Sequence, residues 1–273
     1  MKTKRPLLEL VLERGLIEDE KVARSLIMQG RVLVDGRPST KLGLPINDAA
    51  VIMVRDPECP YVSRAGMKLK NCLVTLGDAA PKIDGQACLD IGSSTGGFTE
   101  VLLEYGAAKV YAVDVGKGLL DGRLRGDPRV VLLEGMNAYN LSAAQLPEHC
   151  AMLTVDVSFA SAAAMLPSLA MFLTNDAHGL VLIKPQFERE DDPEDEKRGW
   201  FVKGVVKCPE LHIKVLSATY TRVRQSGFGV LAVLAAHPTG AKGNREFFLH
   251  LAHTAEGMDE AEFNEAVSRA VNS

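Results

Sequence analysis

Four charged residues stand at or near apolar runs, where their side chains could move a proton. Asp156 follows the run MLTV and Lys184 follows LVLI, so both are expected at the carboxyl ends of strands. In α/β folds that edge of the sheet holds the ligand. Lys68, in SRAGMKL, and Glu246, in GNREFF, lie far away in sequence. A lysine acts as a general base only where burial or a neighbouring cation lowers its pKa, so two lysines with two acids could serve this chemistry.

A glycine-rich loop after the run ACLDI suggests a ligand site. Gly92, Gly96 and Gly97 would let the backbone approach a ligand ahead of a helix N-terminus. Their spacing, GSSTGG, is not the GxGxxG of dinucleotide sites. Asp90 precedes the loop and Asp114 ends the next strand-like run, where a carboxylate can accept hydrogen bonds from two ribose hydroxyls. An adenosyl ligand without a pyrophosphate fits, and S-adenosylmethionine is the leading candidate. A purely structural turn is the alternative.

These residues need a sheet to bring them together, and the chain after residue 86 predicts one. Strand-like runs alternate there with helical stretches, which indicates an α/β, Rossmann-like fold with a parallel sheet and helices on both faces. The apolar stretch 160–173 is about one core helix long, and 259–271 is expected to form a terminal helix. A further helix is expected over 98–105, and strands over 87–91, 110–114, 130–133, 152–155 and 180–183.

Length and charge divide the chain into two parts. Its 273 residues exceed the usual size of one domain, and two prolines bracket a polar stretch at 56–60. We expect domains at 1–58 and 61–273. The whole chain carries a formal charge of −4. However, residues 1–55 hold ten basic and seven acidic residues, while the remainder holds 21 basic and 28 acidic ones. The first part is therefore basic and the second acidic.

The first part reads as a pair of helices followed by a small hairpin. Glu18 to Glu20 open the second helix, Gly30 ends it, and a strand over 31–34 leads to the turn Asp35-Gly36 and a closing strand over 48–54. This order resembles the alpha-L RNA-binding module of ribosomal proteins and pseudouridine synthases. The resemblance implies a small α+β domain that grips structured RNA through its phosphates. The alternative is a packing domain with solvent-facing charges. The candidate RNA-binding residues are Arg5, Arg24, Arg31, Arg37 and Lys41.

Six short strings give the second part a family resemblance. They are VSRAGMKL, LDIGSSTGGFT, VDVSF, LIKPQFE, KGVVK and GNREFFL. Residues 63–253 resemble the FtsJ-type ribose 2′-O-methyltransferases, and with the first part the whole chain is similar to the TlyA family. That family comprises ribosomal RNA cytidine 2′-O-methyltransferases, also called haemolysins. The resemblance implies a class I S-adenosylmethionine-dependent methyltransferase whose partner is ribosomal RNA in a ribosomal subunit.

The same resemblance implies roles for individual residues. The family's Lys-Asp-Lys-Glu catalytic tetrad falls on Lys68, Asp156, Lys184 and Glu246. The residues implied to line the S-adenosylmethionine pocket are Asp90, Gly92, Ser94, Gly96, Gly97, Phe98, Asp114, Asn137 and Asp156.

Other site classes find little support. The five cysteines contain no CxxC pair and the six histidines form no ligand cluster, so neither a disulfide framework nor a metal site is expected. The first residues lack a signal-peptide pattern and no apolar run is long enough to span a membrane. We expect a cytoplasmic protein with no membrane association and no obligate protein partner.

Three rival functions remain as alternatives, and one segment has no assigned role. A membrane-active haemolysin and a non-catalytic ribosome assembly factor are the first two. A base methyltransferase is the third, although the chain lacks the Asn/Asp-Pro-Pro-aromatic motif and the catalytic cysteine of such enzymes. The acidic segment 188–198, EREDDPEDEKR, is expected to be a mobile surface insert and enlarges the usual linker of the family.

Overall fold

The computed structural model describes residues 4–17, 19–54, 59–253 and 257–273. The elements before residue 55 are β1 (Lys4–Pro6), α1 (Leu7–Glu13), α2 (Glu20–Met28), β2 (Val32–Val34), β3 (Arg37–Ser39), β4 (Pro45–Asn47) and β5 (Ile52–Val54). β2 pairs with β3 and β5, and β1 pairs with β4, all antiparallel. Both helices and the strands β2, β4 and β5 contribute to an apolar core of their own. The expected helix residue Glu18 and residues 56–58 of the expected boundary lie outside the described residues.

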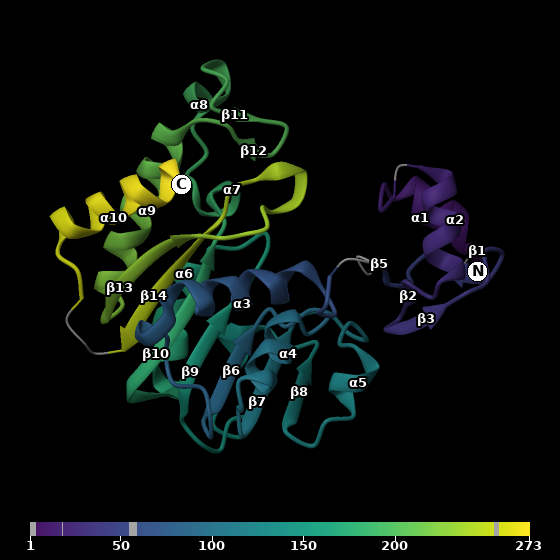
Figure 1. Cartoon of the computed structure of the whole chain (residues 1–273), viewed down its shortest axis with the longest axis horizontal. Helices are drawn as coiled ribbons and strands as arrows, with labels where there is room; N and C mark the ends of the chain where they lie inside the picture. Colours follow the sequence, from purple (N-terminus) through teal and green to yellow (C-terminus); the bar gives the residue numbers. More distant parts are fainter. Residues whose placement is uncertain (1–3, 18, 55–58, 254–256) are drawn as a thin grey trace.

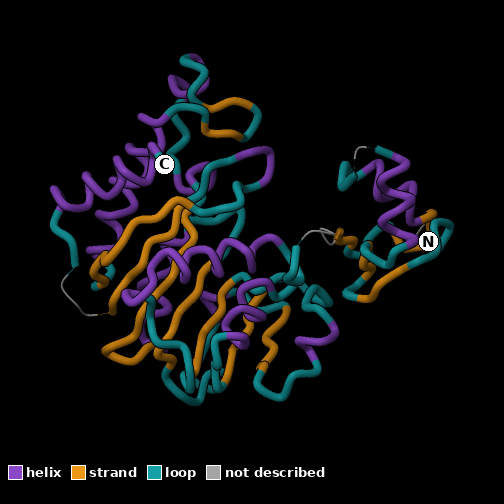
Figure 2. Tube along the Cα trace, viewed as in Figure 1, coloured by secondary structure: helices purple, strands orange, loops and turns teal. Residues whose placement is uncertain are grey.

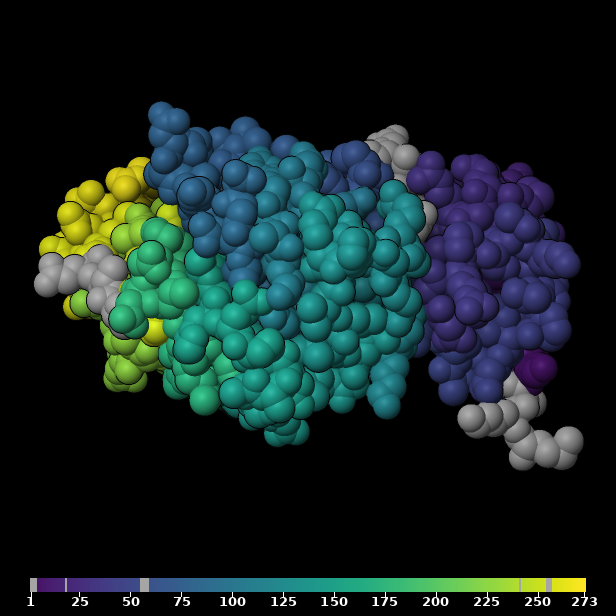
Figure 3. Space-filling view, turned by 90° about the horizontal axis from the view of Figure 1, so that it is seen from below, coloured from purple at the N-terminus to yellow at the C-terminus, as the bar shows by residue number. Residues whose placement is uncertain are grey.

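The closing strand of this part is shorter than its apolar run predicts. Asn47 accepts a hydrogen bond from the Ala49 amide at 3.0 Å and turns the chain. Arg14 also holds the carbonyl of Ala50 at 2.7 Å. The strand therefore begins only at Ile52. Figure 3 shows the residues of this part as a lobe at one end of the molecule.

The second part is built on one seven-stranded sheet (Figure 1). Its strands are β6 (Ala87–Ile91), β7 (Lys109–Asp114), β8 (Val130–Glu134), β9 (Cys150–Val155), β10 (Leu173–Ile183), β13 (Phe228–Ala235) and β14 (Phe247–His253). Their order across the sheet is β13-β14-β10-β9-β6-β7-β8. Because β7 and β8 extend the sheet on one side of β6, and β9 and β10 on the other, the topological switch point lies between β6 and β9. The predicted α/β fold is confirmed.

The alternation of elements suggested a sheet that is parallel throughout. The observed sheet is mixed. The strands from β10 to β8 are parallel, but β14 runs antiparallel to both β10 and β13. In this register Phe247, the first residue of β14, pairs with Ile183, the last residue of β10. A residue just before β14 therefore lies at the carboxyl edge of the parallel strands.

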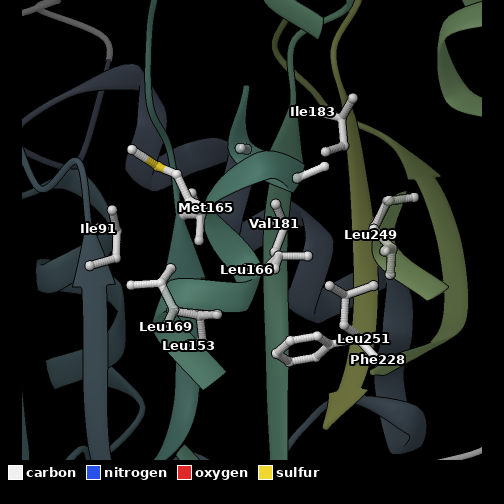
Figure 4. Packing of buried hydrophobic residues seen from close by; sticks show 14 of the residues in the cluster. Ile91, Leu153, Met165, Leu166, Leu169, Val181, Ile183, Phe228, Leu249 and Leu251 are labelled. Atoms are coloured by element: carbon white, nitrogen blue, oxygen red, sulfur yellow. The ribbon is translucent and has the colours of Figure 1, made fainter. Parts of the chain in front are cut away.

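Helices cover both faces of the sheet (Figure 2). They are α3 (Arg64–Leu76), α4 (Gly97–Glu104), α5 (Gly122–Arg125), α6 (Ala162–Leu169), α9 (Pro209–Gln225) and α10 (Glu260–Asn272), and 3-10 turns are at Gly77–Ala79, Ala138–Asn140, Ala170–Phe172 and Ala241–Gly243. Alternate side chains of β10 enter two cores, as strand geometry requires. Leu180 and Leu182 pack with residues of α3 and α4. Val181 and Ile183 pack with residues of α6, α9 and α10, and Figure 4 shows part of this core.

Two expectations about local structure are corrected. The stretch 160–173 is not one helix, since α6 ends at Leu169 and β10 starts at Leu173. The acidic segment is partly ordered, with α7 (Pro185–Glu188) and α8 (Pro193–Lys197) leading to the hairpin β11 (Phe201–Val202) and β12 (Val205–Val206). Glu188 is 5% exposed and Asp195 is 3% exposed. Long-range contacts bury these two carboxylates, which local composition does not predict.

A histidine pair joins β10 and β14 at the end of the sheet away from Lys184. The His178 and His250 rings lie 5.1 Å apart, and His178 Nδ1 is 3.0 Å from His250 Nε2. His250 is 3% exposed. Burial, with a smaller contribution from the charge of His178, lowers the pKa of His250 to about 4.

None of the helices in the described ranges is long and apolar enough to cross a membrane.

We predict that His250 makes the protein less stable as the pH falls below neutrality. The unfolded chain takes up a proton near pH 6.5, while the folded chain takes it up only near pH 4. The loss is about 2 kcal/mol at pH 5. Urea unfolding at pH 7 and pH 5 should show that His250→Gln loses less stability than wild type between the two conditions. His149→Gln, at an exposed histidine, is the control. Equal losses in wild type and His250→Gln would contradict the prediction.

Candidate active site

Lys184 and Asp156 meet at the carboxyl edge of the sheet. Lys184 follows β10 and Asp156 follows β9, and these strands are parallel neighbours. Lys184 Nζ lies 2.7 Å from Asp156 Oδ1 and donates a hydrogen bond to Ser158 Oγ at 3.0 Å. The side chains of Lys184 and Asp156 are 12% and 15% exposed. Partial burial strengthens the attraction between the two charges, so the amine is held in place.

Lys68 and Glu246 form a second pair from more distant parts of the chain. Lys68 Nζ, on α3, lies 2.5 Å from Glu246 Oε2, and the two side chains are 10% and 3% exposed. The Gln186 amide donates to the other oxygen of Glu246 at 3.4 Å. A Cβ on Gly240 would lie 2.0 Å from that oxygen, so only glycine leaves room for the carboxylate. The structure thus brings the four expected residues together as two lysine–carboxylate pairs.

One cavity connects this cluster with the glycine loop. It has a volume of about 450 Å³, and we call it the central cavity. Lys68, Asp156, Ser158 and Lys184 line one part of it. The loop residues Gly92, Ser93, Ser94, Thr95, Gly97 and Phe98 line another part, and apolar residues of the first lobe, among them Leu33 and Ile52, also contribute.

Close packing explains the glycines of the loop. Gly92 has φ +80°, and a Cβ there would lie 2.4 Å from the Asp156 carbonyl oxygen. A Cβ on Gly97 would lie 2.3 Å from Ser63 Oγ. Ser93 Oγ is buried in this loop without a hydrogen-bond partner among the described residues. The loop therefore fits tightly against its neighbours and leaves one polar atom available to a ligand.

Four residues expected in the cofactor pocket do not line the central cavity: Asp90, Asp114, Asn137 and Gly96, which is the N-cap residue of α4. Asp90 is fully buried beneath the loop, where Thr99 and Thr154 donate to its two oxygens at 2.6 and 2.8 Å. Burial raises the pKa of Asp90 to about 6. Asp114 accepts from the amides of Ser94 and Gly116 at 2.8 and 2.6 Å. Its carboxylate is thus tied to the loop.

Asn137 is the third of these residues. It follows β8 and accepts from the Tyr139 amide at 3.1 Å, which caps a 3-10 turn. It is exposed and is not among the residues that line the central cavity. Phe98, by contrast, lines the cavity and packs its ring 5.9 Å from Phe248.

Known proteins resemble the chain over nearly its full length. It matches the FtsJ-like methyltransferase family over residues 61–253. The 16S/23S rRNA (cytidine-2′-O)-methyltransferase TlyA of Mycobacterium tuberculosis is 38% identical over 96% of this chain and 95% of its own. Hemolysin A of Brachyspira hyodysenteriae is 37% identical over 89% of this chain and 97% of its own. The chain belongs to the TlyA group of FtsJ-like methyltransferases. The resemblance drawn from the six motifs is thereby confirmed.

A solved structure supports the same assignment. A hemolysin-named protein of Streptococcus thermophilus superimposes with a TM-score of 0.73 at 31% identity, covering 100% of this chain and 97% of its own. Both the first lobe and the methyltransferase part are therefore shared with that structure.

Four residues near the positions expected for the tetrad were not singled out from sequence. Ser158 binds Lys184, and Gln186 binds Glu246, as described above. Phe159 has φ +64°, is 90% exposed, and packs its ring 5.0 Å from Phe187. All four lie within VDVSF or within LIKPQFE, so proximity to the tetrad in sequence was the available signal.

Glu188 joins the two loops that carry these residues. Its oxygens accept from Ser161 Oγ at 2.5 Å and from the amides of Ala162 and Ala163 at 2.6 and 3.3 Å. It thus caps the N-terminus of α6, where a carboxylate is favourable. The loop after β9 and the loop after β10 are consequently held together by Glu188 in addition to the Asp156–Lys184 pair.

The expected RNA-binding residues differ in their surroundings. Arg5 is ion-paired with Glu9 and Glu13, and Arg24 with Glu20. Partners of this kind reduce the charge available to phosphate. Arg37 and Lys41 are exposed, Arg31 is half-buried, and none of the three has an ion pair within the described part of the chain.

No group of three or more metal-ligating side chains is found among the described residues.

We predict that Gly92→Ala disturbs the tetrad through the backbone. The added Cβ would collide with the Asp156 carbonyl in a left-handed conformation, lowering the free energy of unfolding by about 1–3 kcal/mol. Gly122→Ala is the matched control, because its Cβ would meet nothing within 4 Å and its φ is not positive. Denaturant unfolding of both variants measures the difference. Equal stability of Gly92→Ala and wild type would contradict the close packing described here.

Proposed function

We propose that the protein transfers a methyl group from S-adenosylmethionine to the 2′-hydroxyl of a ribose, that of a cytidine in ribosomal RNA. The observation that carries this proposal is the pair of lysine–carboxylate contacts at the edge of the central cavity, next to the glycine loop. The methyltransferase family and the name of the M. tuberculosis relative support it. A ribosomal substrate would place the enzyme in the cytoplasm.

The residues of the central cavity fit the expected methyl donor. Ser93 Oγ is buried and unpartnered there, as the polar end of a bound ligand requires. Asp114 is outside the lining of the cavity but is bonded to the lining residue Ser94, and each of its oxygens keeps a lone pair that could accept from a ribose hydroxyl. We assign the donor to the surface formed by the loop from Gly92 to Phe98, Asp114 and Asp156. When bound, its sulfonium supplies an electrophilic methyl group.

The tetrad would then prepare the acceptor hydroxyl. Lys184 lines the cavity and is paired with Asp156, so it is the candidate to accept the 2′-hydroxyl proton in its neutral form. Lys68 and Glu246 would hold the other side of the site. Since the methyl donor is already reactive, much of the acceleration is expected from aligning the hydroxyl oxygen with the methyl group.

The first lobe is proposed to supply RNA affinity. We assign residues 1–58 to an RNA-binding domain and residues 61–273 to the methyltransferase domain. Arg37 and Lys41 are exposed at the hairpin and free to meet phosphates, while Arg31 is half-buried nearby. Phosphate contacts provide affinity without reading sequence. Near the tetrad, the exposed ring of Phe159 offers a face on which an unstacked base can lie.

We predict that Lys184→Ala abolishes methyl transfer while S-adenosylmethionine still binds. Loss of a positioned general base lowers kcat by on the order of 10²–10⁴-fold. Transfer of labelled methyl groups to ribosomal subunits gives the rate, and calorimetry gives cofactor affinity. Lys109→Ala is the control, since Lys109 pairs with Glu148 outside the cavity.

The same variant tests the proposed product. Ribosomal RNA from cells lacking the protein should miss a ribose methylation, as mapped by mass spectrometry. The wild-type gene should restore the mark and Lys184→Ala should not. Wild-type turnover by Lys184→Ala would contradict the mechanism, and an unchanged methylation map would contradict the function.

We predict that Arg37→Ala combined with Lys41→Ala weakens RNA binding without changing kcat. Each lost phosphate contact lowers the slope of log affinity against log salt by about 1. Binding to ribosomal RNA fragments over a range of salt concentrations measures both affinity and slope. Arg5→Ala should have a smaller effect, because Glu9 and Glu13 already neutralise Arg5. An unchanged slope in the double variant would contradict the assignment.

A further inference from the structure

The orientation of a lysine base depends on its hydrogen-bond acceptors. A neutral primary amine has two N–H bonds and one lone pair, arranged around nitrogen with the chain carbon as the fourth substituent. The Cε–Nζ bond rotates freely unless acceptors hold the N–H groups. A base of this kind works only when its lone pair faces the proton that it removes.

In the described part of the chain, Lys184 Nζ has one hydrogen-bond acceptor and one ion-pair partner. Ser158 Oγ accepts from Nζ at 3.0 Å, whereas Asp156 Oδ1 lies 2.7 Å from Nζ as a charge contact and has no hydrogen-bond partner. Both residues line the central cavity together with Lys184. If the neutral amine keeps one N–H on Ser158 and turns the other toward the Asp156 carboxylate, the third position around Nζ is left to the lone pair. The ion pair with Asp156 alone would leave the rotation of the amine undetermined.

We propose that Ser158 is a positioning residue that turns the lone pair of Lys184 toward the ribose 2′-hydroxyl. The inference rests on the proposed function and adds to it a residue outside the tetrad. Without the serine hydroxyl, an N–H of Lys184 could point at the 2′-oxygen and donate to it. That hydrogen bond would occupy one of the two lone pairs of the 2′-oxygen and would leave the lone pair of Lys184 turned away from the hydroxyl proton.

Ser158 takes part in the methyl transfer only as a hydrogen-bond acceptor and is chemically unchanged at its end. The 2′-oxygen forms a bond to the methyl carbon with its own electron pair while its O–H bond breaks. The proton goes to the Lys184 lone pair. The electron pair of the broken sulfur–carbon bond stays on sulfur, which loses its positive charge as Lys184 gains one. The resulting ammonium of Lys184 has three N–H groups, and two of them can be directed at Asp156 and Ser158.

The loop that carries Ser158 is fixed on its far side. Phe159 follows it in a left-handed conformation and packs on Phe187, and Ser161 is bound by Glu188. Phe187 and Glu188 belong to the same short segment as Lys184. The Ser158 hydroxyl is therefore held relative to Lys184 by contacts on both sides, as a positioning role requires.

The test compares Ser158→Val with Ser158→Thr, which have nearly the same shape and differ in the hydroxyl group. For Ser158→Val we expect kcat to fall on the order of tenfold to a hundredfold, the range for one hydrogen bond to a charged group. The KM for ribosomal substrate and the affinity for S-adenosylmethionine should stay within about threefold of wild type. Ser158→Thr should retain most of kcat. Ser158→Ala, which adds no bulk, should behave like Ser158→Val.

Several outcomes would overturn the inference. A wild-type kcat in Ser158→Val and Ser158→Ala would do so, as would equal losses in Ser158→Thr and Ser158→Val. A raised KM with unchanged kcat would make Ser158 a binding residue instead. Lys184→Ala, assayed in parallel, separates the two proposals. If Lys184→Ala is inactive while Ser158→Val is fully active, only this inference fails, and if Lys184→Ala is active, the proposed function fails.

Discussion

The close approach of β6 and β9 is the constraint on which the site depends. At the switch point the Asp156 amide donates to the Ile91 carbonyl at 2.9 Å, and Gly92 turns away directly over the Asp156 carbonyl. Only glycine fits there. This contact brings the glycine loop to Asp156, and Asp156 in turn holds Lys184 at the end of the neighbouring strand. The glycine loop and the Asp156–Lys184 pair therefore share one backbone junction.

The direction of β14 places the last member of the tetrad. The register with β10 puts Phe247 opposite Ile183, so Glu246 arrives at the same edge as Lys184 from the other chain direction. Glu246 then reaches Lys68 of α3, which packs on the opposite face from α6. The tetrad thus joins three strand ends and one helix, and a shift in any of them would separate the two pairs.

Sequence predicted those features that depend on local pattern. The strand β6 begins and ends as its apolar run predicts, and Asp156 and Lys184 lie where strand ends were expected. Features that depend on distant contacts were missed. Asp90 looked like a ligand residue but bonds two threonines beneath the loop. Glu188 looked like part of a solvated acidic run but caps α6. The contacts of Asp90 with the two threonines and of Glu188 with α6 form only when the sheet and its helices pack, so local sequence does not predict them.

The two lobes differ in the sign of their net charge. The tetrad contains two lysines and two carboxylates, so it has no net charge with which to attract phosphate. The remainder after residue 55 has seven more acidic than basic residues and would repel RNA at distances up to the screening length of about 8 Å. The proposed RNA affinity is therefore assigned to the basic first lobe and not to the surface around the tetrad.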